Sequence, residues 1–367
     1  MWRVPAVLIL VLLAVFSLAY GEFEKEPYLM YPGRWSSMWI LWQSTSEKAD
    51  LVEIGLDDAF TVATIDSSPG EANVHVAKVS GLSPNTQYQY RVTSGEEVFE
   101  GSFWTAPVQS ADEVTFFGIA DSQFAHCGTA RSIARALNQR IEESEEPTFF
   151  LLAGDWVMWY QPCYLPGTYE NLSRRGQIEL LWDSFFVAHA DVIAAVPAQG
   201  CLGNHDVIDL LELREVHEQY WPYPYVGAAY WSFDYGPVHV TVLDNYTDLS
   251  PGSPQYEWAL RDLERASGRP WTIVQYHDPS RMELWPEFAE RGVDLVVNGH
   301  WHSHQYNVID GIPRLVMSWA SYAPYSHSGA ASAGCLFYEF VVRGPEMTII
   351  ARAPNGSIRQ EITLGSR

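Results

Sequence analysis

The sequence predicts an antiparallel β-sandwich followed by a layered α/β domain, and three observations support this prediction. Residues 22–108 contain short β-rich runs separated by turns with Pro and Gly. From residue 109 to the end at 367, strand-like runs alternate with helical patterns, which is typical of α/β layers. Several of these later strands end in polar residues, as expected where a functional site lies at the carboxyl ends of strands.

A leader precedes the predicted sandwich. Residues 1–21 consist of a short start with Arg3, an apolar run over 4–18, and small residues at Ala19 and Gly21. This order predicts a cleaved signal peptide, which implies a secreted or periplasmic protein with no stable membrane insertion after cleavage. The apolar run is short for a membrane span, and an uncleaved anchor is the alternative.

Composition limits the partners of the protein. The formal net charge is −23, so the chain repels nucleic-acid polymers and anionic lipid surfaces, and we exclude both as partners. Four cysteines are too few for a disulfide-built fold. Cys127 and Cys163 each follow a predicted site strand, and a disulfide between them would suit an oxidising compartment. Cys201 and Cys335 are expected to be buried thiols.

The sandwich is predicted from its strand-like runs, which are rich in β-branched or aromatic residues. They cover residues 38–42, 51–54, 73–76 and 88–92. Their regular spacing is typical of an antiparallel sandwich. The sequence places no catalytic cluster here, and we interpret His75 as an ordinary strand residue.

The α/β part is predicted from alternating patterns. Buried strands are expected at residues 114–120, 148–153, 271–276 and 293–297, and closing strands within 305–364. Helices are expected at 128–143, 177–189 and 210–220. A further helix begins after Ser253, a favourable N-cap residue, with Pro254 in its first turn.

Five of these strand ends carry residues that suit a metal site. In chain order they are Asp121-Ser122-Gln123, Gly154-Asp155, Gly203-Asn204-His205-Asp206, His277 and Gly299-His300-Trp301-His302. Imidazole nitrogens and carboxylate or amide oxygens are common metal ligands. Any one of these groups alone is explained by a helix cap or a polar turn. Five such groups in order, each after a strand, indicate a metal centre.

The series resembles the sequence blocks of the calcineurin-like metallophosphoesterases, which run G-D, G-N-H-D/E, a later His, and G-H-x-H. The run that begins Glu26-Pro27-Tyr28-Leu29 and the segment Ser253-Pro254-Gln255 resemble the purple acid phosphatase branch. Residues 82–92 resemble the end of a fibronectin type III-like domain. The resemblance covers nearly the whole mature chain, and it implies two packed mixed β-sheets flanked by helices.

The resemblance also implies a dinuclear metal centre that holds Fe, Mn or Zn. Asp155 would bridge the two ions. The other ligands would be Asp121 and His302 for one ion, and Asn204, His277 and His300 for the other. Hydroxide formed between ions roughly 3.5–4 Å apart would then attack the phosphorus atom of a phosphomonoester.

Three further groups are expected to act on the substrate. His205 would hydrogen-bond a phosphoryl oxygen or protonate the leaving alkoxide, with Asp206 orienting it. Gln123 stands where other branches of the family have His, and it would ligate weakly through its amide oxygen or bind substrate through its NH₂ group. His304 is expected at the edge of the pocket, where it would contact phosphate; a plain surface position is the alternative.

Met158 departs from the purple acid phosphatase pattern. That branch has Tyr three residues after the bridging Asp, and charge transfer from its phenolate to ferric ion gives the colour. We therefore predict no purple absorption band. Two aromatic stretches, residues 156–169 and 220–225, would either stack an aromatic part of a substrate or pack against the domain.

These observations together predict a secreted, metal-dependent phosphoesterase that hydrolyses small phosphomonoesters, similar to the acid phosphatases. A phosphodiesterase acting on nucleotide or lipid-headgroup diesters is the enzymatic alternative, since one metal core supports both reactions. An extracellular binding protein with a degraded metal site is the alternative from another class, and Met158 and Gln123 motivate it.

Overall fold

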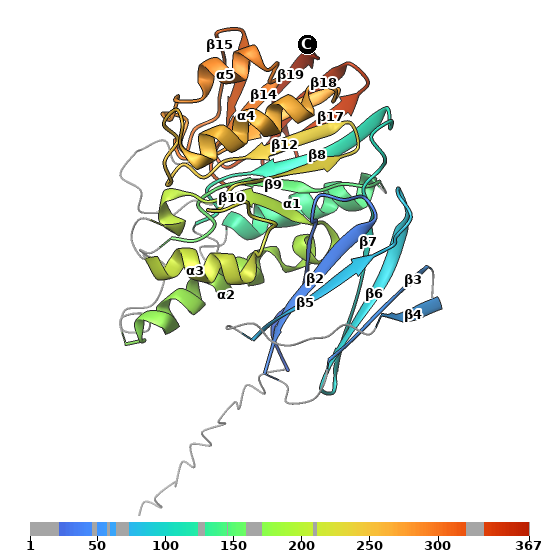
Figure 1. Ribbon diagram of the computed structural model, residues 1–367. Helices are drawn as coiled ribbons and strands as arrows, with labels where there is room; N and C mark the ends of the chain where they lie inside the picture. Colours follow the sequence, from blue (N-terminus) through green and yellow to red (C-terminus); the bar gives the residue numbers. More distant parts are fainter. Residues whose placement is uncertain are drawn as a thin grey trace, which may run out of the picture.

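The protein is described by a computed structural model in which strands form two sheet layers over a smaller sandwich (Figure 1). The structure describes residues 22–45, 50–56, 59–63, 73–123, 129–144, 146–158, 171–207, 211–320 and 334–366. No helix within these residues is long and apolar enough to cross a membrane.

The N-terminal part is an antiparallel sandwich of two small sheets. One sheet has the order β1-β2-β5 and the other the order β4-β3-β6-β7. The strands are β1 (Phe23–Met30), β2 (Ser37–Ser44), β3 (Leu51–Leu56), β4 (Ala59–Ala63), β5 (Val74–Ser80), β6 (Gln87–Ser94) and β7 (Glu97–Trp104). In β3 and β6 buried and less buried residues alternate, because one face of each strand packs in the sandwich core.

The first large sheet, here called sheet C, is mixed. Its order is β10-β9-β8-β17-β18-β19, with β8, β9 and β10 parallel and the last three strands antiparallel. The strands are β8 (Glu113–Ile119), β9 (Phe150–Ala153), β10 (Ala198–Cys201), β17 (Phe337–Arg343), β18 (Glu346–Arg352) and β19 (Ile358–Gly365).

The second large sheet, sheet E, is also mixed. Its order is β11-β12-β13-β14-β16-β15, with the four central strands parallel and the outer pairs antiparallel. The strands are β11 (Trp231–Tyr235), β12 (Val238–Val242), β13 (Trp271–Gln275), β14 (Leu295–Asn298), β15 (Gln305–Ile309) and β16 (Ile312–Val316). Strand β13 is buried throughout, as expected for a central strand covered on both faces.

Helices cover the outer faces of the two large sheets (Figure 1). They are α1 (Thr129–Ser144), α2 (Arg174–Ala195), α3 (Leu211–Tyr220), α4 (Pro254–Ala266) and α5 (Trp285–Glu290), and a 3₁₀ turn, η2, spans Asn204–Asp206. The N-cap prediction at Ser253 is confirmed, because its hydroxyl accepts the Tyr256 N–H at 3.3 Å. Helix α2 is longer at both ends than predicted, and α5 was not predicted.

Sheets C and E pack face to face. Phe149, the residue before β9, contacts Phe233 and Tyr235 of β11, with ring centroids 5.3 and 4.6 Å apart. The Gln275 side chain crosses the interface and donates to the Leu152 carbonyl at 2.8 Å. The predicted fold class, a layered α/β domain of two mixed sheets behind an antiparallel sandwich, is thereby confirmed.

The sandwich docks on helix α2 and the end of α3 through buried tyrosines. The Tyr28 hydroxyl of β1 donates to the Tyr220 carbonyl at 2.7 Å, and the Tyr90 hydroxyl of β6 donates to the Ala194 carbonyl at 2.7 Å. Trp221 is fully buried and packs on Tyr28, with ring centroids 4.9 Å apart. This part of the 220–225 aromatic stretch therefore serves packing.

Candidate metal centre

The predicted ligands lie together because their strands run parallel. In sheet C the carboxyl ends of β8, β9 and β10 are followed by Asp121, Asp155 and Asn204. In sheet E the carboxyl ends of β13 and β14 are followed by His277 and His300. Since the two sheets pack face to face, these loop groups meet at one edge of the domain.

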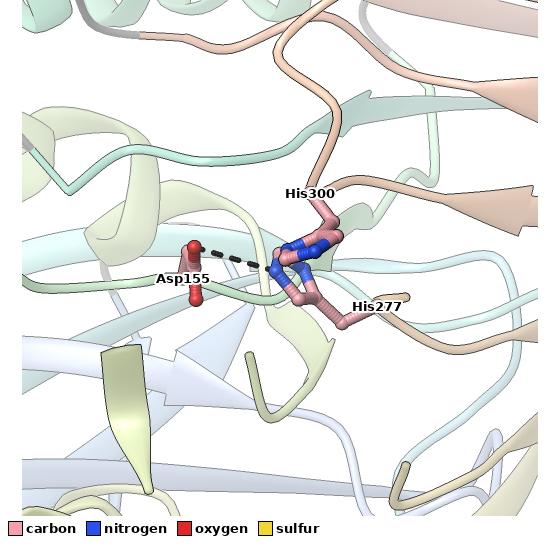
Figure 2. A group of neighbouring side chains, drawn as sticks. All are labelled: Asp155, His277 and His300. Atoms are coloured by element: carbon pink, nitrogen blue, oxygen red, sulfur yellow. Dashed lines mark ion pairs between the residues drawn. The ribbon is translucent and has the colours of Figure 1, made fainter. Parts of the chain in front are cut away.

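One group of donor atoms comes from Asp155, His277 and His300 (Figure 2). Their ligand atoms lie within 4.8 Å of one another, and the Asp155 and His277 side chains are buried. His277 Nε2 is 3.3 Å from Asp155 Oδ2 and 3.2 Å from Asn204 Oδ1. The Asn204 amide oxygen therefore adjoins the same group. The nitrogen and oxygen donors of this group suit a transition metal.

A second group comes from Asp121, Asp155 and His302, again within 4.8 Å. His302 Nε2 lies 3.2 Å from Asp121 Oδ1 and 2.7 Å from Gln123 Nε2. The His302 ring is stacked on Trp319, with centroids 4.8 Å apart, which holds the ring in place. Asp155 is common to both groups, as a bridging ligand has to be.

The backbone at these positions is strained. Among described non-Gly residues seven have positive φ, and four of them are Asp121 (53°), Asp155 (56°), His300 (72°) and His302 (53°). This conformation costs an L-residue on the order of 1–3 kcal/mol, and it persists where the surrounding structure and function require it. The concentration of such residues at the predicted ligands marks this edge as the functional site.

At two positions in the site only glycine fits, because neighbouring atoms leave no room for a Cβ. A Cβ on Gly203 would lie 2.1 Å from Asp155 Oδ1 and 2.2 Å from the Asp155 amide nitrogen. A Cβ on Gly299 would lie 2.6 Å from the Ala153 carbonyl oxygen and 2.8 Å from Asp121 Oδ2. Backbone occupies both places, so neither clash is relieved by a side-chain rotation.

The charges of the site call for a cation. Asp155 Oδ2 is buried and accepts no hydrogen bond from a described residue, while the ring nitrogens of His277 and His205 lie 3.3 and 3.9 Å away. Burial alone would raise the pKa of Asp155, but the positive charge of His277 outweighs it and lowers the pKa to about 2. A buried carboxylate oxygen of this kind needs a counter-charge. Metal ions fit this need and the donor set.

Asp206 binds the backbone of the loops that carry the predicted ligands. Its buried carboxylate accepts backbone N–H groups from Gly203 at 2.7 Å, Asp155 at 3.0 Å and Trp156 at 3.1 Å. The contacts of Asp206 with described residues include no hydrogen bond to the His205 ring. These contacts hold the Asp155 loop against the Asn204 turn, and the orientation of His205 by Asp206 stays a prediction. Burial and then the charge of Asp155 raise the pKa of Asp206.

His205 lies at the mouth of the site. Its backbone N–H donates to Asp155 Oδ1 at 2.9 Å, and its side chain is 23% exposed, more than those of Asp155 and His277. An imidazole that is partly open to solvent beside the metal ligands can meet a substrate that enters from outside. The catalytic part predicted for it stays a prediction.

His304 and Gln123 differ in how they are held. Both His304 ring nitrogens are engaged, at 3.1 Å with the Tyr338 hydroxyl and at 2.5 Å with Gln360 Oε1, so the ring is tied to β17 and β19. Gln123 is 2% exposed, and its Oε1 accepts no hydrogen bond from a described residue. Its amide therefore lies inside the Asp121 group with an oxygen available. The substrate contacts predicted for both residues stay predictions.

The loop after β12 also reaches this edge, and the sequence patterns did not reveal it. Asn245 is 1% exposed, and its Oδ1 accepts the Asp278 N–H at 2.7 Å, next to His277. Tyr246 follows it, and its buried hydroxyl has no hydrogen-bond partner among the described residues. The sequence could have placed this loop at the site only by its position, because the loop follows β12, which is parallel to β13.

Three described histidines outside the site are held within the packed domain. His189 and His217 are both 1% exposed among aromatic rings, and burial lowers their pKa to about 4 and about 3. His239 lies between Asp234, at 2.7 Å, and Asp262, at 3.1 Å.

The four cysteines and the leader complete the comparison with the sequence predictions. Cys127, Cys163 and residues 1–21, including the predicted signal peptide, lie outside the described residues. Cys201 is a buried thiol as predicted, whereas Cys335 is only partly buried.

The geometry described so far is that of a metallophosphoesterase domain, and comparison with known proteins assigns the family. The model of the calcineurin-like phosphoesterase family matches residues 114–304, and that of the purple acid phosphatase N-terminal domain matches residues 25–110. The first match covers more than half of the chain, so the chain belongs to the calcineurin-like phosphoesterase family, and its N-terminal part is of the purple acid phosphatase type.

Individual relatives agree with this assignment. Purple acid phosphatase 21 of Arabidopsis thaliana is 26% identical over 258 residues, which cover 63% of this chain and 53% of that protein. Acid phosphatase type 7 of Danio rerio is 25% identical over 293 residues, or 72% and 61% of the two chains. This chain thus spans about half to three fifths of the length of these relatives.

Solved structures confirm the fold. Purple acid phosphatase PPD1 from yellow lupin seeds superposes with a TM-score of 0.72 at 16% identity, covering 92% of this chain and 74% of that chain. PhoD superposes with a TM-score of 0.68 at 14% identity, covering 93% and 90%. At these identities the likeness concerns the arrangement of the chain alone.

Proposed function

We propose that this protein is a metal-dependent phosphoesterase that hydrolyses small phosphomonoesters. The observation that carries the proposal is the pair of donor groups that share Asp155, because together they would hold two cations side by side. The family assignment supports the reaction class. Residues 22–108 would form the sandwich domain, and residues 109–367 would form the catalytic domain.

We assign Asp121 and His302 to one ion, Asn204, His277 and His300 to the other, and Asp155 to both. When bound, two such ions neutralise phosphoryl charge and acidify water. Iron, manganese and zinc all accept this mixture of imidazole, carboxylate and amide donors.

The residues of the chain have separate tasks in this proposal. His205, partly exposed beside Asp155, would donate a proton to the leaving oxygen or a hydrogen bond to the phosphoryl group. Asp206 would keep the Asp155 loop in the conformation that metal binding needs. Gln123 would turn its unengaged amide oxygen toward the first ion or its substrate.

The test is metal content and turnover measured on the same protein. The chain would be purified without chelators, supplied in parallel with iron, manganese or zinc, and analysed for metal per chain. We expect two ions per chain in the wild type and fewer in Asp155→Ala. The matched control is Asp191→Asn, which changes an exposed carboxyl group on α2 and should retain both ions.

Matched aryl substrates then distinguish the reactions. We expect p-nitrophenyl phosphate to be hydrolysed faster than bis(p-nitrophenyl) phosphate. Faster diester turnover would support the phosphodiesterase alternative instead. A chain that binds none of the metals and hydrolyses neither substrate would refute the enzyme and leave the binding-protein alternative.

The compartment is proposed from the leader. Residues 1–21 have the order of a secretory signal. Mass spectrometry of protein from the culture medium, with an N-terminus near residue 22, would support secretion. Retention of residues 1–21 on a cell-associated protein would contradict it.

A further inference from the structure

Tyr246 lies at the edge of sheet E that carries the predicted metal ligands. It follows β12, which runs parallel to β13, while β13 runs parallel to β14. The carboxyl ends of these three strands therefore open on the same side. His277 and His300 come from the loops after β13 and β14, so Tyr246 occupies the corresponding position on the neighbouring strand.

The loop that carries Tyr246 is braced on both sides. Gln255 of α4 donates to the Asp244 carbonyl at 3.0 Å and to Thr247 Oγ1 at 2.7 Å. On the other side Asn245 Oδ1 accepts the N–H of Asp278, the residue after His277. These bonds hold the Tyr246 backbone in place relative to the site.

The Tyr246 ring packs beside the Asn204 turn. It contacts the small cluster of Leu202, Val207 and Ala229. Leu202 and Val207 flank residues 203–206, which contain Asn204 and His205. The ring therefore packs against residues that flank the Asn204 turn, while the neighbouring Asn245 side chain ties the same loop to the residue after His277.

The hydroxyl of Tyr246 is buried and has no hydrogen-bond partner among the described residues. Most buried hydroxyl groups in folded proteins have a partner, so this exception calls for an explanation. After burial, the charges of Asp155 and Asp278 are the largest influences that raise its pKa, which agrees with a position near the ligand carboxylates. A neutral O–H donor is thus kept beside the place where an anion would bind.

We propose that the Tyr246 hydroxyl donates a hydrogen bond to a non-bridging oxygen of the phosphoryl group. This inference rests on the proposed phosphoesterase function and adds a substrate-contacting residue to it. The hydroxyl supplies a donor without adding charge, and an anionic acceptor makes its hydrogen bond stronger than one between neutral groups. No bond is made or broken at Tyr246, which stays protonated throughout.

The experiment compares Tyr246→Phe with Tyr225→Phe in the metal-loaded protein. Tyr225 packs against the same small cluster, but its hydroxyl already donates to the Trp221 carbonyl at 3.1 Å. We expect Tyr246→Phe to lower kcat/KM for p-nitrophenyl phosphate and the affinity for inorganic phosphate by about 10- to 100-fold each. Metal content should not change, and Tyr225→Phe should retain the wild-type phosphate affinity and turnover.

Thermal unfolding without phosphate gives an independent readout. Removing a buried hydroxyl that has no partner among the described residues should leave the Tm of Tyr246→Phe equal to that of the wild type or raise it by about 2 °C or more. Removing the bonded hydroxyl of Tyr225 should lower the Tm. If loss of the Tyr246 hydroxyl preserves stability and weakens phosphate binding, then the hydroxyl serves ligand binding and not the stability of the fold.

Two results would overturn the proposal: wild-type phosphate affinity in Tyr246→Phe, or a lower Tm together with lost metal, which would indicate a structural hydroxyl. Phosphate binding by calorimetry keeps this test separate from catalysis. If the wild-type protein binds phosphate but hydrolyses no ester, the proposed function is refuted. The Tyr246 contact is still tested in that case, because phosphate binding is measured separately.

Discussion

The Asp206 carboxylate accepts the backbone N–H of Asp155 at 3.0 Å, so one acidic residue holds the backbone of another. It also accepts the N–H groups of Trp156 and Gly203. These contacts fasten the loop after β9 to the turn after β10, where Asp155 and Asn204 stand. The relative position of these two predicted ligands depends on a side chain that need not touch a metal.

Asp206→Asn should therefore weaken both folding and metal retention. The amide NH₂ would face backbone donors in place of an acceptor oxygen and leave N–H groups unpaired. We expect the free energy of unfolding to fall by about 2–4 kcal/mol, measured by urea denaturation of the metal-free protein. Asp191→Asn on the surface of α2 is the matched control, and equal stability of the two variants would contradict this account.

His205→Ala should separate catalysis from metal binding. The His205 ring is outside both donor groups, so the variant should keep its metal while turnover of p-nitrophenyl phosphate falls about 10²- to 10⁴-fold. Elemental analysis and initial rates on the same preparation check this. Loss of metal from the variant would show that His205 is a structural or ligating residue instead.

Met158 leads to a spectroscopic prediction. It is the third residue after Asp155, where the purple enzymes have Tyr, so the iron-loaded wild type should lack a strong visible charge-transfer band. Met158→Tyr should gain such a band, because a phenolate then becomes available to ferric ion. Absorption spectra of the two iron-loaded proteins decide the matter, and a purple wild type would show that another residue supplies the phenolate.

The buried histidines should make the fold sensitive to acid. Burial lowers the pKa of His189 to about 4, below the ordinary value of 6.5, and that of His217 to about 3. The unfolded chain then binds more protons as pH falls below about 6.5. Stability is fully present above that pH and is lost as pH falls toward about 4, by roughly 3 kcal/mol for His189 alone.

Urea denaturation at pH 7, 5.5 and 4.5 tests this sign. Phe at both positions preserves a planar ring and cannot be protonated, so His189→Phe/His217→Phe should lose less stability on acidification than the wild type. Identical slopes in the two proteins would show that other groups dominate acid unfolding.

Sequence patterns predicted that these residues would meet at one edge of the domain, because Asp155, Asn204 and His300 each follow a Gly at the end of a buried strand. When such a strand is recognised in the sequence, its direction is known, and so is the end of the sheet at which the following residue lies. The fold class followed from the alternation of strands and helices for the same reason. Family resemblance supplied the division of the ligands between two ions, which spacing alone does not contain.

The parts that escaped prediction depend on contacts between distant segments. Asp206 follows His205 directly, but this adjacency does not reveal that the Asp206 carboxylate also binds backbone 50 residues away in the chain, at Trp156. Tyr246 carries no motif, and only the pairing of β12 with β13 places it at the site. Helix α2 begins with Arg174 and Arg175, which oppose the helix dipole, so its start was predicted too late.

Both donor groups draw on both large sheets: Asp121 and Asp155 belong to sheet C, whereas His277, His300 and His302 belong to sheet E. A bound ion is therefore a cross-link between the halves of the domain. Only a molecule whose sheets have already come together in the correct register can offer a complete ligand set. Under the proposed ligand assignment, uptake of added metal would therefore report that the two sheets have come together, before any substrate is added.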